Sequence, residues 1–291
     1  MTETIRTPLQ HEILKTNGVN LHVVRAGAPE GKPVILLHGF PEFWYGWRGQ
    51  IDALVAAGYY LMIPDQRGYN LSDKPEGLDK YHITELVADV IGLMDQLQAE
   101  KVTLIGHDWG AMVTWWTALM HPERLEKIAI LNVPHPEVFR KTLTSDPQQM
   151  LKSWYAGMFQ LPFLPEALFT LNGNALLENA VKGSARKGSF TAADMQLYRE
   201  AWARPNALSA MLNWYRAYVQ RPIPEREDWR VTVPTLMLWG AKDFALSEKM
   251  AQPSIDLCDD GQLHIIKRAT HWVQHDAAED VNAHLIDFLG R

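Results

Sequence analysis

Cysteine is almost absent from this chain. Cys258 is the single cysteine among 291 residues, which excludes an internal disulfide framework and any zinc or iron–sulfur site built from several cysteines. Long hydrophobic runs are missing as well. Stretches such as residues 34–37 fall far short of the ~20 apolar residues that a membrane-spanning helix needs, so we expect no membrane partner.

An excess of positive charge is also absent. The chain has 28 Lys and Arg against 34 Asp and Glu, a net charge of -6, and no dense basic run occurs. Because nucleic-acid-binding proteins carry clustered positive charge, we expect no nucleic-acid partner. Residues 1–10 lack the basic start and apolar stretch of a signal peptide, which predicts a cytoplasmic protein.

The rest of the composition is that of a globular protein. Hydrophobic residues make up 47% of the chain and charged residues 21%, which are ordinary proportions. Strands and helices alternate along the first part of the chain. The apolar patterns predict strands at 19–26, 33–38, 60–64, 101–106 and 127–133, and helices at 44–57, 83–98 and 109–120.

This alternation stops between residues 134 and 230, where helical stretches and loops rich in aromatic residues and proline follow one another without a strand pattern. Strands return at 235–239 and 263–266, and helices at 247–258 and 277–289. Alternating strands and helices favour a mostly parallel sheet flanked by helices. We therefore predict an α/β domain made of residues 1–133 and 231–291, interrupted by a helical insertion at 134–230.

The segment Gly106-His107-Asp108-Trp109-Gly110 joins a predicted strand to a predicted helix. This context matches the G-x-S-x-G nucleophile elbow, with aspartate in place of serine. A carboxylate is ionised at neutral pH and needs no base to become a nucleophile. Its attack on an sp³ carbon that carries a leaving group gives an alkyl ester of Asp108. A purely structural turn is the alternative, and the strand–turn–helix context favours the nucleophile.

Hydrolysis of such an ester needs a base and an acid that orients it. His271 follows the last predicted strand, and the order nucleophile, acid, histidine is the one expected of this architecture. Asp243 follows the strand at 235–239. The competing position for the acid, after the strand at 127–133, offers Asn132 and no adjacent carboxylate. We therefore predict His271 as the base and Asp243 as its acid, rather than a structural histidine and a solvated turn residue.

An oxyanion hole is predicted from the segment HGFP at 38–41, which follows a strand. The backbone N–H groups of Phe40 and Trp109 would hold the negative charge of the intermediate, whereas Pro41 has no N–H to offer. His271 and His275 have a metal-ligand spacing, but the glutamate of the zinc-protease pattern is missing. We expect no metal and no cofactor.

With these residues in place, the chain resembles the α/β-hydrolase-fold epoxide hydrolases over essentially its whole length. The resemblance is carried by HGFPE at 38–42, WYGWR at 44–48, RGYNLSD at 67–73 and GHDWG at 106–110. It implies the α/β-hydrolase fold of a soluble, bacterial-type enzyme, in which the helical insertion is a cap domain.

The resemblance also implies two cap tyrosines that donate hydrogen bonds to the epoxide oxygen. SWY at 153–155 matches the first tyrosine motif and NWYR at 213–216 the second, which identifies Tyr155 and Tyr215. A phenol has a pKa of ~10, stays protonated at neutral pH and can supply a proton as the ring opens. Simple packing of aromatic residues in an apolar cap is the alternative.

We therefore expect an epoxide hydrolase that converts a small-molecule epoxide and water to a vicinal diol through an aspartyl ester. The sequence leaves open whether the protein forms a homodimer. The residues expected to bind the substrate are His38, Trp154, Phe159, Leu161 and Phe163.

Haloalkane dehalogenase, with the same aspartate–histidine–aspartate triad, is the main alternative. Its halide site needs a second donor beside Trp109, which Phe40 lacks and Trp154 could provide. Fluoroacetate dehalogenase is disfavoured because Trp109 stands where that enzyme has arginine. A non-catalytic binding protein on this scaffold is expected to have lost Asp108 or His271, and both are present.

Overall fold

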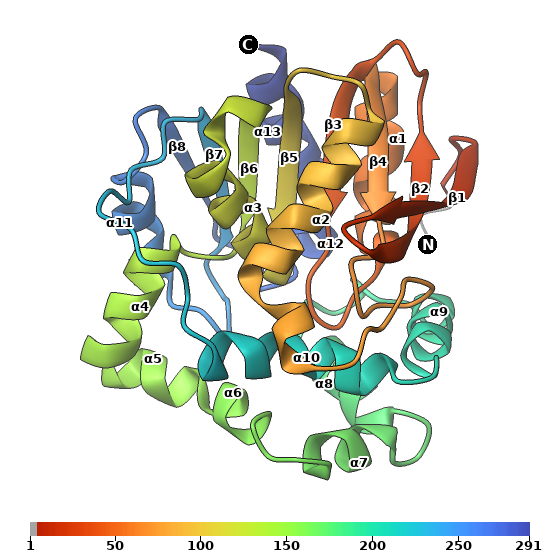
Figure 1. The fold of residues 1–291 in the computed structure, drawn as a ribbon, viewed down its shortest axis with the longest axis vertical. Coiled ribbons are helices and arrows are strands. Elements are labelled where there is room, and N and C mark those ends of the chain that lie inside the picture. The colour runs from red at the N-terminus through yellow and green to blue at the C-terminus, as the bar shows by residue number, and fades with distance from the viewer. Residues whose placement is uncertain (1–4) are drawn as a thin grey trace.

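The computed structural model describes residues 5–291, whose centre is an eight-stranded sheet in the order β1-β2-β4-β3-β5-β6-β7-β8 (Figure 1). Strands β3 to β8 run parallel, whereas β2 pairs antiparallel with both β1 and β4. The strands are β1 (Leu9–Thr16), β2 (Val19–Ala26), β3 (Lys32–Leu37), β4 (Tyr59–Pro64), β5 (Val102–His107), β6 (Leu125–Leu131), β7 (Thr235–Gly240) and β8 (Gly261–Ile266).

Both faces of the sheet are covered by helices (Figure 1). On one face lie α1 (Arg48–Ala56), α12 (Val273–Asp276) and α13 (Ala278–Gly290), and on the other α2 (Ile83–Gln96), α3 (Trp109–Met120) and α11 (Ala251–Ile255). Side chains of β3 alternate between the two cores: Val34 and Leu36 pack with the first group of helices, Ile35 and Leu37 with the second. Burial on both faces explains why this strand reads as a continuous apolar run.

The helices between β6 and β7 lie beyond the carboxyl ends of the parallel strands (Figure 1). We call this group the helical layer. It consists of α4 (Pro136–Ser145), α5 (Pro147–Lys152), α6 (Trp154–Met158), α7 (Leu164–Thr170), α8 (Ala175–Ser184), α9 (Ala192–Trp202) and α10 (Ala207–Gln220). The domain boundaries expected around it, at 134 and 230, stay predictions.

The expected α/β fold is confirmed, and the differences are local. Strand β1 has no counterpart among the expected elements, because it lies at the sheet edge and most of its residues are exposed or half-buried. The predicted helix at 44–57 divides into a 3₁₀ turn (Trp44–Trp47) and α1, and the one at 247–258 into a 3₁₀ turn (Glu248–Met250) and α11. Further 3₁₀ turns are Leu78–Tyr81 and Pro122–Arg124. Within residues 5–291, no helix combines the length and the apolar character needed to cross a membrane.

Candidate active site

Asp108 occupies the sharp turn between β5 and α3, with a φ of +49° that non-glycine residues rarely adopt. The glycines on either side make this turn sterically feasible. A Cβ atom on Gly106 would collide with the backbone of Gly110, and one on Gly110 with the backbone of Leu37. The turn thus places the Asp108 carboxylate at the carboxyl end of the sheet, against the helical layer.

The two oxygens of Asp108 have different partners. Oδ1 accepts a hydrogen bond of 2.6 Å from the backbone N–H of Phe40. Oδ2 lies 3.3 Å from Nε2 of His271. The other expected oxyanion donor, Trp109, is the first residue of α3, where backbone N–H groups have no acceptor within the helix.

Burial by itself raises the pKa of Asp108, but the hydrogen bond and the positive charge of His271 outweigh it. The resulting pKa lies below the usual value, so Asp108 is ionised at neutral pH.

The close contact between Asp108 and the HGFP segment depends on Gly39, because a Cβ atom there would collide with the Asp108 side chain.

His271 is held by Asp243, whose Oδ2 accepts a 2.8 Å hydrogen bond from the Nδ1 atom of the imidazole. Oδ1 of Asp243 accepts hydrogen bonds from the backbone N–H groups of Ala245 and Leu246, at 2.7 and 2.8 Å. Asn132, at the end of β6, donates its amide to Oδ2 of Asp243 at 2.8 Å. From the sequence, Asn132 only marked the end of a strand at which no carboxylate occurs. In the structure its side chain instead supports the carboxylate of Asp243, which follows the neighbouring strand β7.

The imidazole of His271 lies between two carboxylates and is itself buried. Burial lowers its pKa, but the charge of Asp243 and the hydrogen bond that His271 donates to Asp108 act in the opposite direction and raise the pKa to about 10. An imidazolium flanked by two carboxylates is therefore the resting state at neutral pH.

Glu42 anchors the loop that carries His271 and was not singled out from the sequence, although it belongs to the HGFPE segment. Its fully buried carboxylate accepts hydrogen bonds from Tyr198 at 2.6 Å, His275 at 2.7 Å and Gln274 at 2.9 Å. Beside it, Nε2 of His107 donates to the backbone carbonyl of His271 at 2.8 Å. Burial raises the pKa of Glu42, but the neighbouring histidines hold it well below the usual value.

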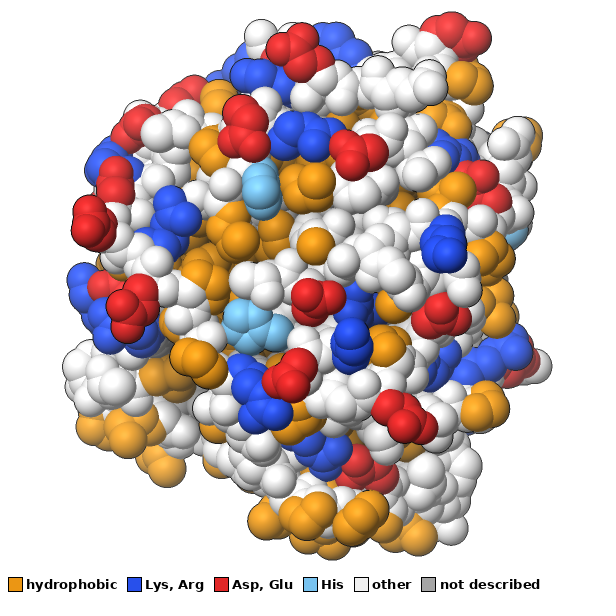
Figure 2. All heavy atoms as spheres, in the orientation of Figure 1, with side chains coloured by type: hydrophobic (Ala, Val, Ile, Leu, Met, Phe, Trp, Pro, Cys, Tyr) orange, Lys and Arg blue, Asp and Glu red, His pale blue; other side chains and the backbone are white. Residues whose placement is uncertain are grey.

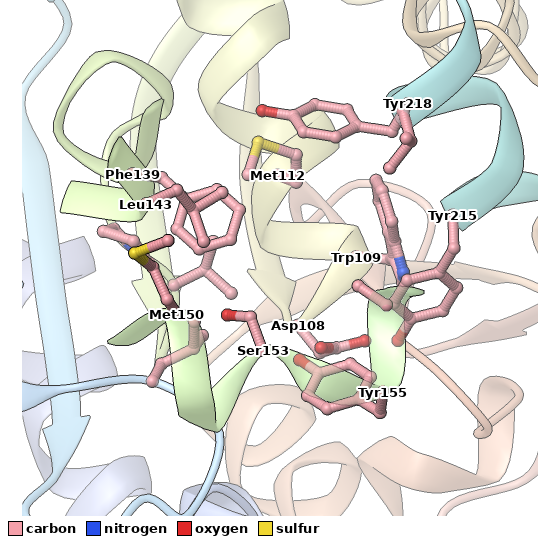
Figure 3. A pocket seen from close by; sticks show the side chains of 15 residues that line it. Asp108, Trp109, Met112, Phe139, Leu143, Met150, Ser153, Tyr155, Tyr215 and Tyr218 are labelled. Carbon is pink, nitrogen blue, oxygen red and sulfur yellow. The ribbon is translucent and has the colours of Figure 1, made fainter. Parts of the chain in front are cut away.

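Two cavities meet at Asp108, and we call them the first and second arms. The first arm, of about 470 Å³, lies between α3, α4, α5 and α10, and the second, of about 580 Å³, lies between the core loops, α7 and α8. Asp108, Tyr155 and Tyr215 line both arms. Figure 3 shows the first arm, with the hydroxyl groups of both tyrosines directed toward the Asp108 carboxylate.

The two tyrosines are held mainly by aromatic rings. The ring of Tyr215 lies 4.9 Å from that of Phe159, 5.0 Å from Trp109 and 5.3 Å from Phe40, and Tyr155 packs on Phe159 at 5.7 Å. Burial raises the pKa of both phenols above the usual value, and the nearby charge of Asp108 adds to this effect. Both hydroxyls therefore carry their protons at neutral pH.

The residues expected to bind substrate lie in different places. Phe159 and Trp154 line the second arm. The two expected oxyanion donors also border the cavities, Phe40 the second arm and Trp109 the first. Leu161 and Phe163 lie outside both arms, because the connection from α6 to α7 turns them to the surface, where Phe163 is 83% exposed.

His38 also lies outside both arms and is fully buried. Its Nδ1 donates to the carbonyl of Gly39 at 3.0 Å, and its Nε2 accepts the N–H of Gln66 at the same distance. Its imidazole holds the HGFP segment in place and does not face the substrate cavity.

Known proteins resemble this chain in sequence and in fold. The sequence profile of the alpha/beta hydrolase fold matches residues 32–278. The chain is 47% identical over 278 residues to the AB hydrolase superfamily protein YfhM of Bacillus subtilis (strain 168), covering 96% of this chain and 97% of that protein. It is 38% identical over 283 residues to Epoxide hydrolase 4 of Homo sapiens, covering 95% of this chain and 77% of that protein.

A solved structure is similar throughout. Bacillus megaterium epoxide hydrolase in complex with an inhibitor superposes with a TM-score of 0.89 at 30% sequence identity, and the match covers 96% of this chain and 100% of that one. The chain therefore belongs to the α/β-hydrolase fold family, in the branch that contains the epoxide hydrolases.

Proposed function

We propose that the protein hydrolyses an epoxide to a vicinal diol through an ester of Asp108. One observation carries this proposal: an ionised carboxylate and two protonated phenols line the same junction of an apolar cavity. Opening an epoxide creates an alkoxide, which is costly in apolar surroundings unless a donor meets it. Tyr155 and Tyr215 supply that donor, and Asp108 supplies the nucleophile.

The first step forms the ester. Oδ1 of Asp108 already rests on the N–H of Phe40, so Oδ2 is the oxygen that attacks an epoxide carbon. The carbon–oxygen bond of the ring breaks, and the departing oxygen takes a proton from one of the two phenols. The hydroxy ester of Asp108 and a tyrosinate result.

The second step hydrolyses the ester and restores every proton. Esterification removes the charge of Asp108, so the pKa of His271 falls and its proton passes through solvent to the tyrosinate. The neutral imidazole, oriented by Asp243, then takes a proton from water that attacks the ester carbonyl. The N–H groups of Phe40 and Trp109 hold the oxyanion on Oδ1. When the intermediate collapses, the ester C–O bond breaks and the leaving oxygen takes the remaining proton of the attacking water. The diol is released, with Asp108 as carboxylate and His271 as imidazolium.

The geometry counts against the dehalogenase alternative. A halide site needs two donors that converge on one leaving group, and the indoles offered by the sequence were Trp109 and Trp154. Trp109 borders the first arm, whereas Trp154 borders the second and is 67% exposed. The two indoles therefore do not share a cavity.

The mechanism is tested by trapping the ester. With styrene oxide as substrate, His271→Gln should accumulate an adduct on Asp108, visible by intact-protein mass spectrometry and lost in Asp108→Ala. Asp108→Ala should also make no diol. Diol formation by His271→Gln without an adduct under single-turnover conditions would argue for direct attack by water. Halide release from 1-bromobutane with no diol from any epoxide would favour the dehalogenase.

A further inference from the structure

Helix α5 turns a polar side chain inward and apolar side chains outward. Gln149 is fully buried, whereas its neighbours Met150 and Leu151 are 53% and 75% exposed. Hydrophobic side chains also gather along the lower edge of the molecule, where the helical layer lies (Figure 2). A buried amide is costly unless its donors and its acceptor are bonded, so the partners of Gln149 show what this side chain holds.

The amide of Gln149 holds the loop that follows β7 and carries the acid of the triad. We call residues 243–247 the acid loop. Nε2 of Gln149 donates to the carbonyl of Ala245 at 2.8 Å, and Oε1 accepts a hydrogen bond from the backbone N–H of Ser247 at 2.9 Å. Nε2 also donates to Oγ of Ser153 at 3.0 Å. The side chain thus uses both its donor group and its acceptor on the backbone of the acid loop.

Gln149 and Asp243 bind opposite ends of one peptide unit. The carbonyl of the peptide between Ala245 and Leu246 accepts the hydrogen bond from Gln149. The N–H of the same peptide donates to Oδ1 of Asp243 at 2.8 Å. The C=O and N–H groups of a trans peptide lie in one plane and point in opposite directions. Rotation of this peptide away from Gln149 would therefore also break its bond to Asp243.

The chain of hydrogen bonds continues to the imidazole, because Oδ2 of Asp243 accepts a hydrogen bond from Nδ1 of His271 at 2.8 Å. A donor on the carbonyl of a peptide polarises that peptide and strengthens its N–H as a donor, so the bonds of such a chain support one another. Lys152, three residues further along α5, donates to the backbone carbonyl of Asp243 at 2.8 Å. Two side chains of α5 therefore hold the acid loop.

We infer that Gln149 is a positioning residue for hydrolysis of the ester. It fixes the acid loop, so that Asp243 keeps the imidazole of His271 oriented toward the attacking water. The inference rests on the proposed function and adds a residue to it. Although α5 belongs to the helical layer, this side chain serves the core side of the site. Glutamine suits the role because its amide presents a donor and an acceptor at the same end of the side chain.

Gln149→Met tests the inference, because methionine keeps the length of the side chain and removes both the N–H donors and the carbonyl acceptor. Hydrolysis of the ester should slow by at least about tenfold, whereas ester formation from styrene oxide should stay within about twofold of the wild-type rate. Single-turnover quenched-flow experiments, read by intact-protein mass spectrometry, give both rates. Because both are rates of the folded protein, a loss of stability lowers the amplitude and leaves their ratio unchanged.

Gln148→Met is the matched control. It makes the same chemical change on the neighbouring residue of α5, whose side chain is exposed and accepts a hydrogen bond from Lys249 at 3.3 Å. Both rates should stay at the wild-type value. If Gln149→Met does not fold, Gln149→Glu replaces it, because a carboxylate still accepts the N–H of Ser247 but cannot donate to Ala245. This variant should slow hydrolysis by at least about threefold.

A double-mutant cycle shows whether Gln149 acts through Asp243. In the Asp243→Asn background, Gln149→Met should slow hydrolysis by less than about threefold, because the carboxylate that the amide helps to hold is already gone. A residue with a merely structural role would slow hydrolysis by the same factor in both backgrounds.

The outcomes separate the two levels of the proposal. Hydrolysis at the wild-type rate in the folded Gln149 variant, or equal factors in both backgrounds, would overturn the positioning role while epoxide hydrolysis stands. Slower ester formation alone would overturn it as well, since the amide would then act through Ser153 and the adjoining helix of Tyr155. If the wild type forms neither an ester nor a diol from styrene oxide, the proposed function itself is overturned.

Discussion

The two walls of the active site are built in different ways. On the core side, the carboxylate of Asp243 alone accepts four hydrogen bonds, from Asn132, Ala245, Leu246 and His271. On the side of the helical layer, Tyr155 and Tyr215 are positioned mainly by neighbouring aromatic rings. Directional bonds fix the groups that exchange protons with water and the ester, whereas ring packing leaves the substrate side room to adapt.

This difference predicts that mutations on the two sides affect different steps. Changes in the helical layer should alter formation of the ester, where the substrate's size and oxygen matter. Changes around Asp243 and His271 on the core side should alter its hydrolysis, where the imidazole must meet water at one fixed point.

The largest effect is expected from the tyrosines. Tyr155→Phe and Tyr215→Phe should each slow ester formation by ~10²–10³, by analogy with the loss of one oxyanion donor, and the double variant should retain almost no activity. Tyr218→Phe is the matched control, because Tyr218 lines only the first arm. Pre-steady-state kinetics should show ester hydrolysis little changed. If the double variant forms the ester at the wild-type rate, the two tyrosines serve only in packing and do not assist ring opening.

The next effect is on stability as a function of pH. The pKa of His271 is raised from 6.5 to about 10 in the folded protein, so its contribution is complete below pH ~6.5 and is lost as the pH rises toward 10. At ~1.4 kcal/mol per pKa unit this amounts to a few kcal/mol. Denaturant unfolding at pH 6, 8 and 10 should show the loss in the wild type and not in His271→Gln. An equal loss of stability in both proteins would mean that a group other than His271 titrates in this pH range.

Much of this arrangement follows from local sequence. The glycines around Asp108 specify a sharp strand-to-helix turn, and the position of Asp243 and His271 after strands places them at the same edge of the sheet. Strand β1 was missed because an exposed edge strand has little apolar pattern. Asn132 and Glu42 gave no signal for their roles, because their partners lie on other strands, in later loops or in the helical layer and depend on tertiary packing.

The expected pocket shows the same limit. Phe159 and Trp154 line the second arm, but Leu161 and Phe163 follow α6 closely and nevertheless turn to the surface. Hydrophobic character alone does not say which side of a short connection faces the cavity. The cytoplasmic location and a homodimer stay predictions.

A smaller effect is expected from Asn132, which supports the core wall from the neighbouring strand. Asn132→Ala removes the amide that donates to Asp243 and the oxygen that accepts the N–H of Gly240. Hydrogen bonds to charged groups contribute about 1.5–3 kcal/mol, so ester hydrolysis should slow roughly ten- to hundredfold while ester formation stays near the wild-type rate. Stopped-flow and quenched-flow measurements separate the two steps. Slower ester formation alone would contradict the assignment.

The smallest effect concerns Asp276, which joins the two walls. One oxygen of this buried carboxylate accepts a hydrogen bond from the Oγ1 hydroxyl of Thr270, at 2.6 Å. The other oxygen accepts one from the hydroxyl of Ser189, at 2.5 Å. Thr270 precedes His271, whereas Ser189 lies between α8 and α9 of the helical layer. Each region thus gives Asp276 one hydroxyl hydrogen bond, and each adds a backbone N–H, from Thr270 at 2.7 Å and from Arg186 at 3.0 Å.

Thr270→Val and Ser189→Ala each remove one hydroxyl donor from Asp276, a loss of about 1 kcal/mol. If the walls act separately, Thr270→Val should slow ester hydrolysis by about fivefold, because the bond beside the catalytic imidazole is lost. Ser189→Ala should leave hydrolysis unchanged and alter only the preference between epoxides of different chain length, because α8 borders the second arm. Single-turnover hydrolysis rates and a chain-length series measure the two effects. Equal slowing of hydrolysis by both variants would show that Asp276 couples the helical layer rigidly to His271, and that the two walls work as one unit.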